Sequence, residues 1–274
     1  MMNILLPSDF SENAQRAADF VFEMFDPAGF RLIIVHGVVP PRPSPGMMIN
    51  ITDLMQKDAD RDLLIEKTRL EEKYDGIGRI ETHSKLGYLQ DVLPTFCTTH
   101  NADLVVMGTR GDNTFASKVL GSNTEHIVRL GFAPILAVPA QVEVGDAPKI
   151  CIATAKTEIP HVEVLEKIFK NLKNKLSSRI SVLHVLTNNT DKALKSLALD
   201  GMQIHVETEI ADTAEDGINA YLAKEHVDML VVCHRHNARI DYLFSRSTTK
   251  KLTGQIQVPL MILPGWLPVK QECI

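Results

Sequence analysis

The stretch that decides the fold is residues 103–107, Asp-Leu-Val-Val-Met, because residues 228–232 repeat it as Asp-Met-Leu-Val-Val. A second pair matches at the same offset of 125 residues: Ala-Pro-Ile-Leu-Ala-Val-Pro at 133–139 resembles Val-Pro-Leu-Met-Ile-Leu-Pro at 258–264. Two separate segments that share one offset indicate an internal duplication rather than two unrelated domains.

An earlier segment matches at a larger offset. Residues 31–36, Arg-Leu-Ile-Ile-Val-His, resemble residues 179–184, Arg-Ile-Ser-Val-Leu-His, 148 positions later. The first copy therefore carries 23 extra residues between its two matching segments. We expect the insertion to be the Pro-rich loop at 39–46 and the long polar helix that follows it.

Short apolar runs alternate with amphipathic segments along the first copy. This pattern is typical of a parallel sheet with helices on both faces. The pattern predicts strands at 4–7, 32–35, 80–84, 104–107 and 135–138, and helices capped by Ser11 and at 52–74, 89–99 and 122–130. The second copy is expected to repeat the order from 149 to 264, which predicts two tandem, doubly wound α/β domains of five strands each.

Domain boundaries follow from the same pattern. We predict a nucleotide-binding domain at 1–141, a degenerate copy at 149–265 and a C-terminal tail at 266–274. The linker at 142–148 contains Gly145 and Pro148, which interrupt regular structure.

Composition excludes several classes of protein. The 274 residues carry a formal net charge of −5 and a pI near 6.1, which argues against binding nucleic acid or an anionic membrane surface. The four cysteines show no metal-finger or redox spacing. The sequence opens directly on a strand, without a signal peptide, and has no membrane-spanning run. We expect a cytoplasmic protein.

The chemistry is predicted where the fourth strand ends. Residues 107–111 read Met-Gly-Thr-Arg-Gly, and residues 121–124 read Gly-Ser-Asn-Thr at the start of a helix. Glycines let a backbone approach a phosphate closely, and a helix N-terminus offers free N–H groups. The spacing is neither a P-loop nor a dinucleotide fingerprint. The alternative is a surface loop that needs glycine turns and a helix cap.

These residues resemble the universal stress protein family in its tandem form. Gly108, Gly111, Gly121 and Ser122 match the pattern of members that bind ATP, namely Gly, two residues, Gly, nine residues, Gly and Ser or Thr. The opening at 7–11 and His36 also resemble the ends of the family's first two strands. The resemblance implies an adenine nucleotide alpha hydrolase-like fold, strand order 3-2-1-4-5, and fifth strands that pair across a dimer interface.

The resemblance also implies the ligand and its contacts. Asp9 would meet the adenine or ribose, and Gly37, where the family usually has valine, would lie beside the adenosine. The ligand would be ATP, ADP or AMP, with Mg²⁺ accompanying a triphosphate. The full set of implied binding residues is Pro7, Asp9, Gly37, Met107, Gly108, Gly111, Gly121, Ser122, Asn123 and Thr124. No catalytic residue and no protein metal ligand is assigned.

Several of these residues have a structural alternative. Asp9 could cap the first helix, Met107 could belong to the core, and Thr124 could be a first-turn residue without a ligand. His36 is better interpreted as a packed strand-end residue than as a catalyst.

The second copy departs from the motif. At the 125-residue offset, Gly108 becomes Cys233, Gly111 becomes His236 and Gly121 becomes Arg246, while Asp9 becomes Ala155 at an offset of 146. We therefore expect nucleotide in the N-terminal half only. The run at 233–236, Cys-His-Arg-His, is weak evidence for a metal site. Instead, the second copy is expected to pair its fifth strand with that of the first.

The leading functional hypothesis is a nucleotide-binding sensor or regulator in stress response. It would act on an unknown protein partner, with the proline-rich segment at 39–50 as a lid or only a long connection. A homodimer of the whole chain stays open. The alternatives are a slow ATPase or phosphoryl-transfer enzyme, and a structural scaffold that binds no nucleotide.

Overall fold

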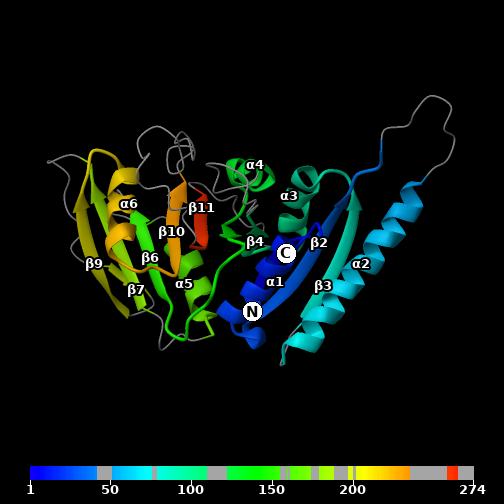
Figure 1. The fold of residues 1–274 in the computed structure, drawn as a ribbon, viewed down its shortest axis with the longest axis horizontal. Helices are drawn as coiled ribbons and strands as arrows, with labels where there is room; N and C mark the ends of the chain where they lie inside the picture. The colour runs from blue at the N-terminus through cyan, green and yellow to red at the C-terminus, as the bar shows by residue number, and fades with distance from the viewer. Residues whose placement is uncertain are drawn as a thin grey trace, which may run out of the picture.

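The computed structural model describes residues 1–41, 51–75, 79–109, 122–154, 159, 161–173, 179–187, 197–199, 202–234 and 258–264. They form one eleven-stranded sheet in the order β3-β2-β1-β4-β5-β11-β10-β6-β7-β9-β8. Figure 1 shows the two halves side by side, with β11 in red between β10 and the first half. Among the described helices, none is long and apolar enough to cross a membrane.

The first half has the predicted topology. Its five strands are parallel and lie in the order 3-2-1-4-5. They are β1 (Met2–Pro7), β2 (Phe30–Val38), β3 (Arg79–Leu86), β4 (Leu104–Gly108) and β5 (Ile135–Val138). The helices are α1 (Glu12–Met24), α2 (Thr52–Lys73), α3 (Leu89–Thr99) and α4 (Ser122–Leu130), with a 3-10 turn at Pro27–Gly29.

The second half repeats this order with one difference. Its strands are β6 (Lys149–Thr154), β7 (Arg179–Leu186), β8 (Leu197–Leu199), β9 (Met202–Ile210), β10 (Met229–His234) and β11 (Leu260–Pro264), with helices α5 (Val162–Lys170) and α6 (Ala214–Lys224). Five of the strands run parallel in the order 3-2-1-4-5, but β8 pairs antiparallel with β9 at the edge of the sheet. The five strands predicted for this half and their order are therefore confirmed, and β8 is an additional short edge strand.

The connection between the second and third parallel strands differs in the two halves. In the first half, α2 carries the chain back between β2 and β3, as expected for a parallel crossover. Between β7 and β9, the described part of the chain returns as the edge strand β8. The extra residues of the first half thus include α2, as the two offsets predict.

Strand register confirms the duplication residue by residue. Gly108 pairs with Val138, and Cys233 pairs with Leu263, so both partners advance by 125 positions. The registers of β1–β2 and β6–β7 are related in the same way by offsets of 146 and 148. Residues that correspond by these offsets therefore occupy equivalent places in the two halves.

The halves join through their fifth strands. Ile135, Leu136 and Ala137 of β5 pair antiparallel with Ile262, Met261 and Leu260 of β11, and all six residues are buried. The predicted pairing of these edges is confirmed. Without this pairing, the N–H and C=O groups along one edge of β5 and of β11 would have no partner in the sheet.

Two hydrophobic cores, one on each face of the sheet, extend through both halves. Leu6 faces the core that contains Phe20 of α1 and Phe169 of α5, whereas Leu5 faces the core that contains Leu93 of α3 and Tyr221 of α6. Alternate strand residues enter opposite cores because successive side chains of a strand point to opposite faces. Helices therefore cover both faces, as the continuous apolar strands predict.

A second contact between the halves lies at the ends of α1 and α5. Phe25 forms an isolated antiparallel bridge with Leu172. The main-chain N–H of Asp26 donates to the carbonyl of Asn171 at 2.9 Å. Nearby, Lys167 of α5 forms an ion pair of 2.6 Å with Asp103, which precedes β4. The halves are thus joined both through the β5–β11 pairing and through the contacts that α5 and its C-terminal end make with the first half.

Ion pairs contribute much of the contact between α2 and α1, because α2 buries few side chains. Its described buried residues are Ala59, Leu63, Glu66 and Leu70. Arg69 binds Glu66 and also contacts Asp19 of α1 at 2.9 Å. Lys73 contacts the other carboxylate oxygen of Asp19 at 2.9 Å. Burial alone would raise the pKa of Asp19, but the hydrogen bonds from Lys73 and Arg69 outweigh it and lower that pKa.

This network predicts a pH-dependent loss of stability. Asp19→Asn should lower the free energy of unfolding at pH 7 by about 1–3 kcal/mol, because two hydrogen bonds to a charged group are weakened. The folded-state pKa lies below the usual 3.8, so the contribution is present above that pH and is lost as pH falls through the lowered value. Urea unfolding of both proteins should therefore converge in acid.

The matched control is Asp58→Asn, which removes an exposed partner of Arg61 on α2. Its effect should stay within about 0.5 kcal/mol at every pH. Equal losses for the two variants would contradict the role given to Asp19.

Candidate functional site

The first wall of the site is the loop that leaves β1. Pro7, the last residue of β1, is buried. The N–H of the next residue, Ser8, donates to the carbonyl of Val35 at 2.9 Å and so continues the strand pairing. The Ser8 hydroxyl accepts a hydrogen bond from the N–H of Phe10 at 3.1 Å. These bonds leave Asp9 exposed at the carboxyl end of the strand.

Phe10 and His36 hold this loop in its conformation. Phe10 has a φ of 62°, a left-handed conformation that is uncommon for an aromatic residue. Its ring stacks on that of His36 with centroids 4.6 Å apart, and Nδ1 of His36 lies 2.7 Å from the Ser8 carbonyl oxygen. His36 is thus a packed strand-end residue, in line with the structural interpretation of the sequence.

Asp9 does not cap α1. The N-cap is Ser11, as predicted, whose Oγ accepts a hydrogen bond from the N–H of Ala14 at 3.3 Å. Asp9 accepts hydrogen bonds from the N–H of Ser11 at 3.1 Å and from its hydroxyl at 2.5 Å. Both bonds end on Oδ1 of an exposed carboxylate, so Asp9 orients the capping residue and still faces solvent.

The second wall is the end of β4. Met107 is 5% exposed and belongs to the core, in line with its structural interpretation. Gly108 follows, and a Cβ added there would lie 2.4 Å from the carbonyl oxygen of Asn13 in α1. A side chain would therefore clash with backbone, so glycine is required here by the close approach of α1 as well as by any ligand. The sequence pattern did not reveal this contact with Asn13.

The third wall is the start of α4. Thr124 is 3% exposed, and its hydroxyl donates to the Gly108 carbonyl at 3.4 Å. This bond brings the first turn of α4 to the end of β4. The first N–H groups of a helix have no partner within it, so this turn offers donors and partial positive charge. Ser122 opens the helix.

Some predicted site residues cannot be placed. Gly111 and Gly121 lie outside the described residues, as do the side chains of Ser122 and Asn123. The same holds for 42–50 of the Pro-rich segment and for the predicted tail.

Gly37 of β2 is enclosed by the turn that leads into α3. A Cβ at Gly37 would lie 2.8 Å from the carbonyl oxygen of Gly87 and 3.0 Å from the N atom of Leu89. Valine, which the family usually has here, would clash with this backbone. The start of α3 thus occupies the side-chain face of Gly37, and a contact with adenosine stays a prediction for its main chain.

The three walls meet at the switch point of the sheet. Strands β1 and β4 are neighbours, with Leu5 beside Val105, and they lie between β2 on one side and β5 on the other. Ligands of open α/β sheets bind beyond the carboxyl ends of the strands at such a point. The structure therefore brings Asp9, Gly108 and Thr124 to one edge of the sheet.

The equivalent corner of the second half differs in residue type. Cys233 occupies the register position of Gly108. His184, the counterpart of His36, is 1% exposed and Thr154, the counterpart of Ser8, is 9% exposed. The counterparts of Asp9, Gly111 and Gly121 lie outside the described residues.

The contact between Gly108 and α1 can be tested by stability alone. Gly108→Ala should lower the free energy of unfolding by about 1–3 kcal/mol, because the added methyl group forces α1 away from β4. Gly145→Ala is the control, since a Cβ there meets nothing within 4 Å. Thermal melting should separate the two variants. A neutral Gly108→Ala would contradict the tight packing of Asn13 on β4.

Comparison with known proteins agrees with this architecture. Residues 1–139 match the universal stress protein family. A universal stress protein of Synechocystis sp. is 26% identical over 198 residues, a match that covers 68% of this chain and 66% of that protein. The universal stress protein in the QAH/OAS sulfhydrylase 3′ region of Thermus aquaticus is 30% identical over 136 residues, covering 49% of this chain and 96% of that protein.

Among solved structures, a universal stress protein from Archaeoglobus fulgidus is similar over 96% of this chain and 98% of its own length. Its TM-score is 0.68 at 18% sequence identity, which shows a shared fold across both halves. The family match, the relatives and the repeated strand register lead to one conclusion: the chain belongs to the universal stress protein family, with two copies of the family's fold in tandem.

Proposed function

We propose that the protein is a cytoplasmic regulator of stress response that binds an adenine nucleotide, ATP or its products ADP and AMP, in its N-terminal half. The observation that carries the proposal is the hydrogen bond from Thr124 to the Gly108 carbonyl. It brings the N-terminal turn of a helix to the switch point of the sheet, at the same edge as the exposed carboxylate of Asp9.

The phosphates would lie at the corner between β4 and α4. The backbone N–H groups of 108–111 and 121–124 would donate to the phosphate oxygens, helped by the partial positive charge at the start of α4. For a triphosphate, Mg²⁺ bound to the phosphates would neutralise part of their charge. An ionised carboxylate only accepts hydrogen bonds, so Asp9 suits the ribose hydroxyls or the adenine amino group.

The same geometry supports a site in one half only. Cys233 puts a side chain at the register position where Gly108 has none. In the sequence, Arg246 replaces Gly121 and Ala155 replaces Asp9. Together these exchanges would remove both the close backbone approach and the carboxylate that the first half offers.

The proposed corner adjoins the junction between the halves. Gly108 pairs with Val138 of β5, and Thr109 donates to the Val138 carbonyl at 2.8 Å. Strand β5 in turn pairs with β11 of the second half. Nucleotide bound at β4 and α4 would therefore act one strand away from the second half, which gives a regulator a short route for its signal.

The carboxylate of Asp9 is tested by Asp9→Asn, which keeps an acceptor for Ser11 but removes the charge. The affinity for ATP should fall about tenfold or more, which corresponds to roughly 1.4 kcal/mol, as measured by isothermal titration calorimetry. Asp26→Asn is the matched control, because Asp26 accepts the N–H of Ala28 two residues on, as Asp9 does for Ser11, but precedes β2. Equal losses would argue against Asp9 as a ligand.

The phosphate corner is tested by Gly121→Arg, which copies the residue of the second half into the first. Binding of ATP should be lost, because the long side chain would fill the space of the phosphates. The control is the same substitution at Gly145, in open space in the linker. If the affinity of Gly121→Arg equals that of the control, the phosphates do not bind here.

Analysis of nucleotide that co-purifies with the chain would distinguish ATP, ADP and AMP, and their absence would favour a scaffold. Incubation with ATP and Mg²⁺ for several hours would reveal a slow ATPase as ADP formation that depends on Asp9.

A further inference from the structure

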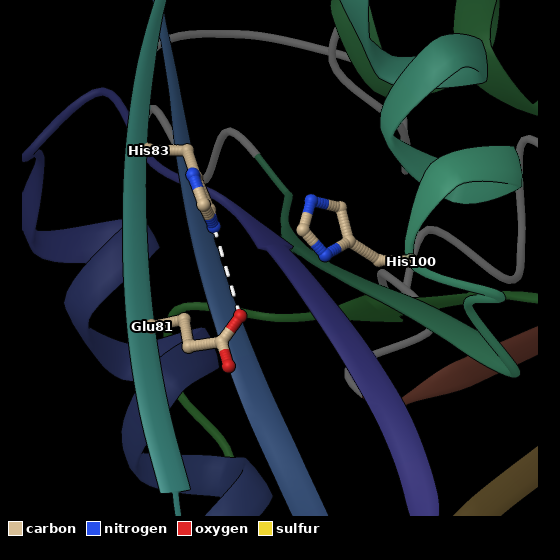
Figure 2. Close-up of side chains that lie close together, drawn as sticks. All are labelled: Glu81, His83 and His100. Atoms are coloured by element: carbon tan, nitrogen blue, oxygen red, sulfur yellow. Dashed lines mark ion pairs between the residues drawn. The ribbon is translucent and has the colours of Figure 1, made fainter.

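Three side chains with metal-binding atoms gather on the face of β3 toward α3. Glu81 and His83 are two residues apart on β3 and therefore point to the same side of the sheet, while His100 ends α3. One ligand atom from each lies within 4.8 Å of the others. Figure 2 shows the carboxylate and the two imidazole rings turned toward one shared space.

The two oxygens of Glu81 have different surroundings. Oε1 accepts Arg79 at 2.7 Å and lies 3.5 Å from Nη1 of Arg31. Oε2 lies 3.7 Å from Nε2 of His83. The arginines thus hold the carboxylate by one oxygen and leave the other directed at the histidines.

His83 has an unsatisfied nitrogen. Its Nε2 is buried and has no hydrogen-bond partner, although such an atom costs free energy when it stays unpaired. The His83 ring contacts the rings of both Phe96 and His100, at centroid distances of 5.8 and 4.9 Å, and those two rings stack on each other at 5.8 Å.

At the equivalent position of the second half, a hydrogen bond within the protein provides the partner of the polar side chain. Ile33 pairs with Glu81 and Ser181 pairs with His205, so His205 and Glu207 correspond to Glu81 and His83. At the 125-residue offset, Tyr221 stands in place of Phe96. The Tyr221 hydroxyl donates to Glu207 at 2.9 Å.

In the first half, the phenylalanine ring has no hydroxyl to offer, and Nε2 of His83 has no hydrogen-bond partner, with Oε2 of Glu81 3.7 Å away. A bound cation would supply the partner that Tyr221 supplies in the second half.

We propose that Glu81, His83 and His100 bind a divalent transition-metal ion such as Zn²⁺. Two imidazoles and one carboxylate are a ligand set that zinc uses, with a fourth position left for water, whereas Mg²⁺ and Ca²⁺ prefer oxygen ligands throughout. Zinc–ligand bonds of about 2.0–2.2 Å place tetrahedral ligand atoms roughly 3.3 Å apart. The ligand atoms, which lie within 4.8 Å of one another, would therefore have to approach by up to about 1.5 Å through side-chain rotations.

The ion would connect the edge strand β3 to the end of α3. It lies apart from the proposed nucleotide corner, because β3 is separated from β1 by β2. The positive charges of Arg31 and Arg79 oppose the ion and weaken its binding, Arg79 from a largely solvated position with 71% of its side chain exposed.

The experiment is a Zn²⁺ titration of the full, nucleotide-free chain against a chromophoric chelator. His83→Ala and His100→Ala should each weaken the affinity at least tenfold, and Glu81→Gln should weaken it severalfold. His205→Ala is the matched control, because it removes an exposed strand histidine from the equivalent position of the second half. Its affinity should equal that of the original chain.

A variant that binds Zn²⁺ more tightly is also informative, because misfolding can explain a loss of affinity but not a gain. Arg79→Gln removes a repelling charge and should tighten Zn²⁺ binding severalfold, more so at low salt. Histidine side-chain NMR should show Zn²⁺ shifting the imidazole nitrogens of His83 and His100. The proposal is overturned if His83→Ala and His100→Ala retain the affinity of the original chain, or if these two imidazoles do not respond to Zn²⁺. In either case any zinc would bind elsewhere, for example at 233–236.

Discussion

The structure depends on the antiparallel pairing of β5 with β11. A sheet in the order 3-2-1-4-5 ends on its fifth strand, and that strand here carries buried apolar residues such as Leu136 and Met261. An open edge of this kind exposes N–H and C=O groups to any other strand. Because the two halves belong to one chain, the partner is always present, and the effective concentration of one edge near the other is high. One continuous sheet and two continuous cores follow from this pairing.

The two halves differ in topology at the two far edges of the sheet. At the far edge of the first half, α2 covers β3 and is fastened to α1 by Asp19, Arg69 and Glu66. At the far edge of the second half, the described chain between β7 and β9 forms the strand β8. The central strands, by contrast, keep their registers to the residue. The difference in strand topology thus lies at the far edges of the sheet, whereas near the junction the two halves differ in residue type, as at Gly108 and Cys233.

Helix α3 relates the two proposed sites. Its beginning lies against Gly37, at the carboxyl end of β2 near the proposed nucleotide corner, and its end carries His100 of the proposed metal site. Both sites also use strands of the first half, on which α3 packs through Leu93. The first half thus holds the proposed chemistry, whereas the second half completes the sheet and satisfies the equivalent polar groups internally, as Tyr221 does for Glu207.

The sequence by itself determined the duplication, the parallel direction of the strands, the Ser11 cap and the bounds of α3 and α4, whereas the strand order was implied by the family resemblance. These features are encoded locally, in apolar periodicity, capping residues and matching offsets. Tertiary structure alone decided three others: the antiparallel edge strand β8, the packing of Asn13 that makes Gly108 obligatory, and the meeting of Glu81, His83 and His100. Each depends on which distant segments pack together, and periodicity along one chain carries no record of such contacts.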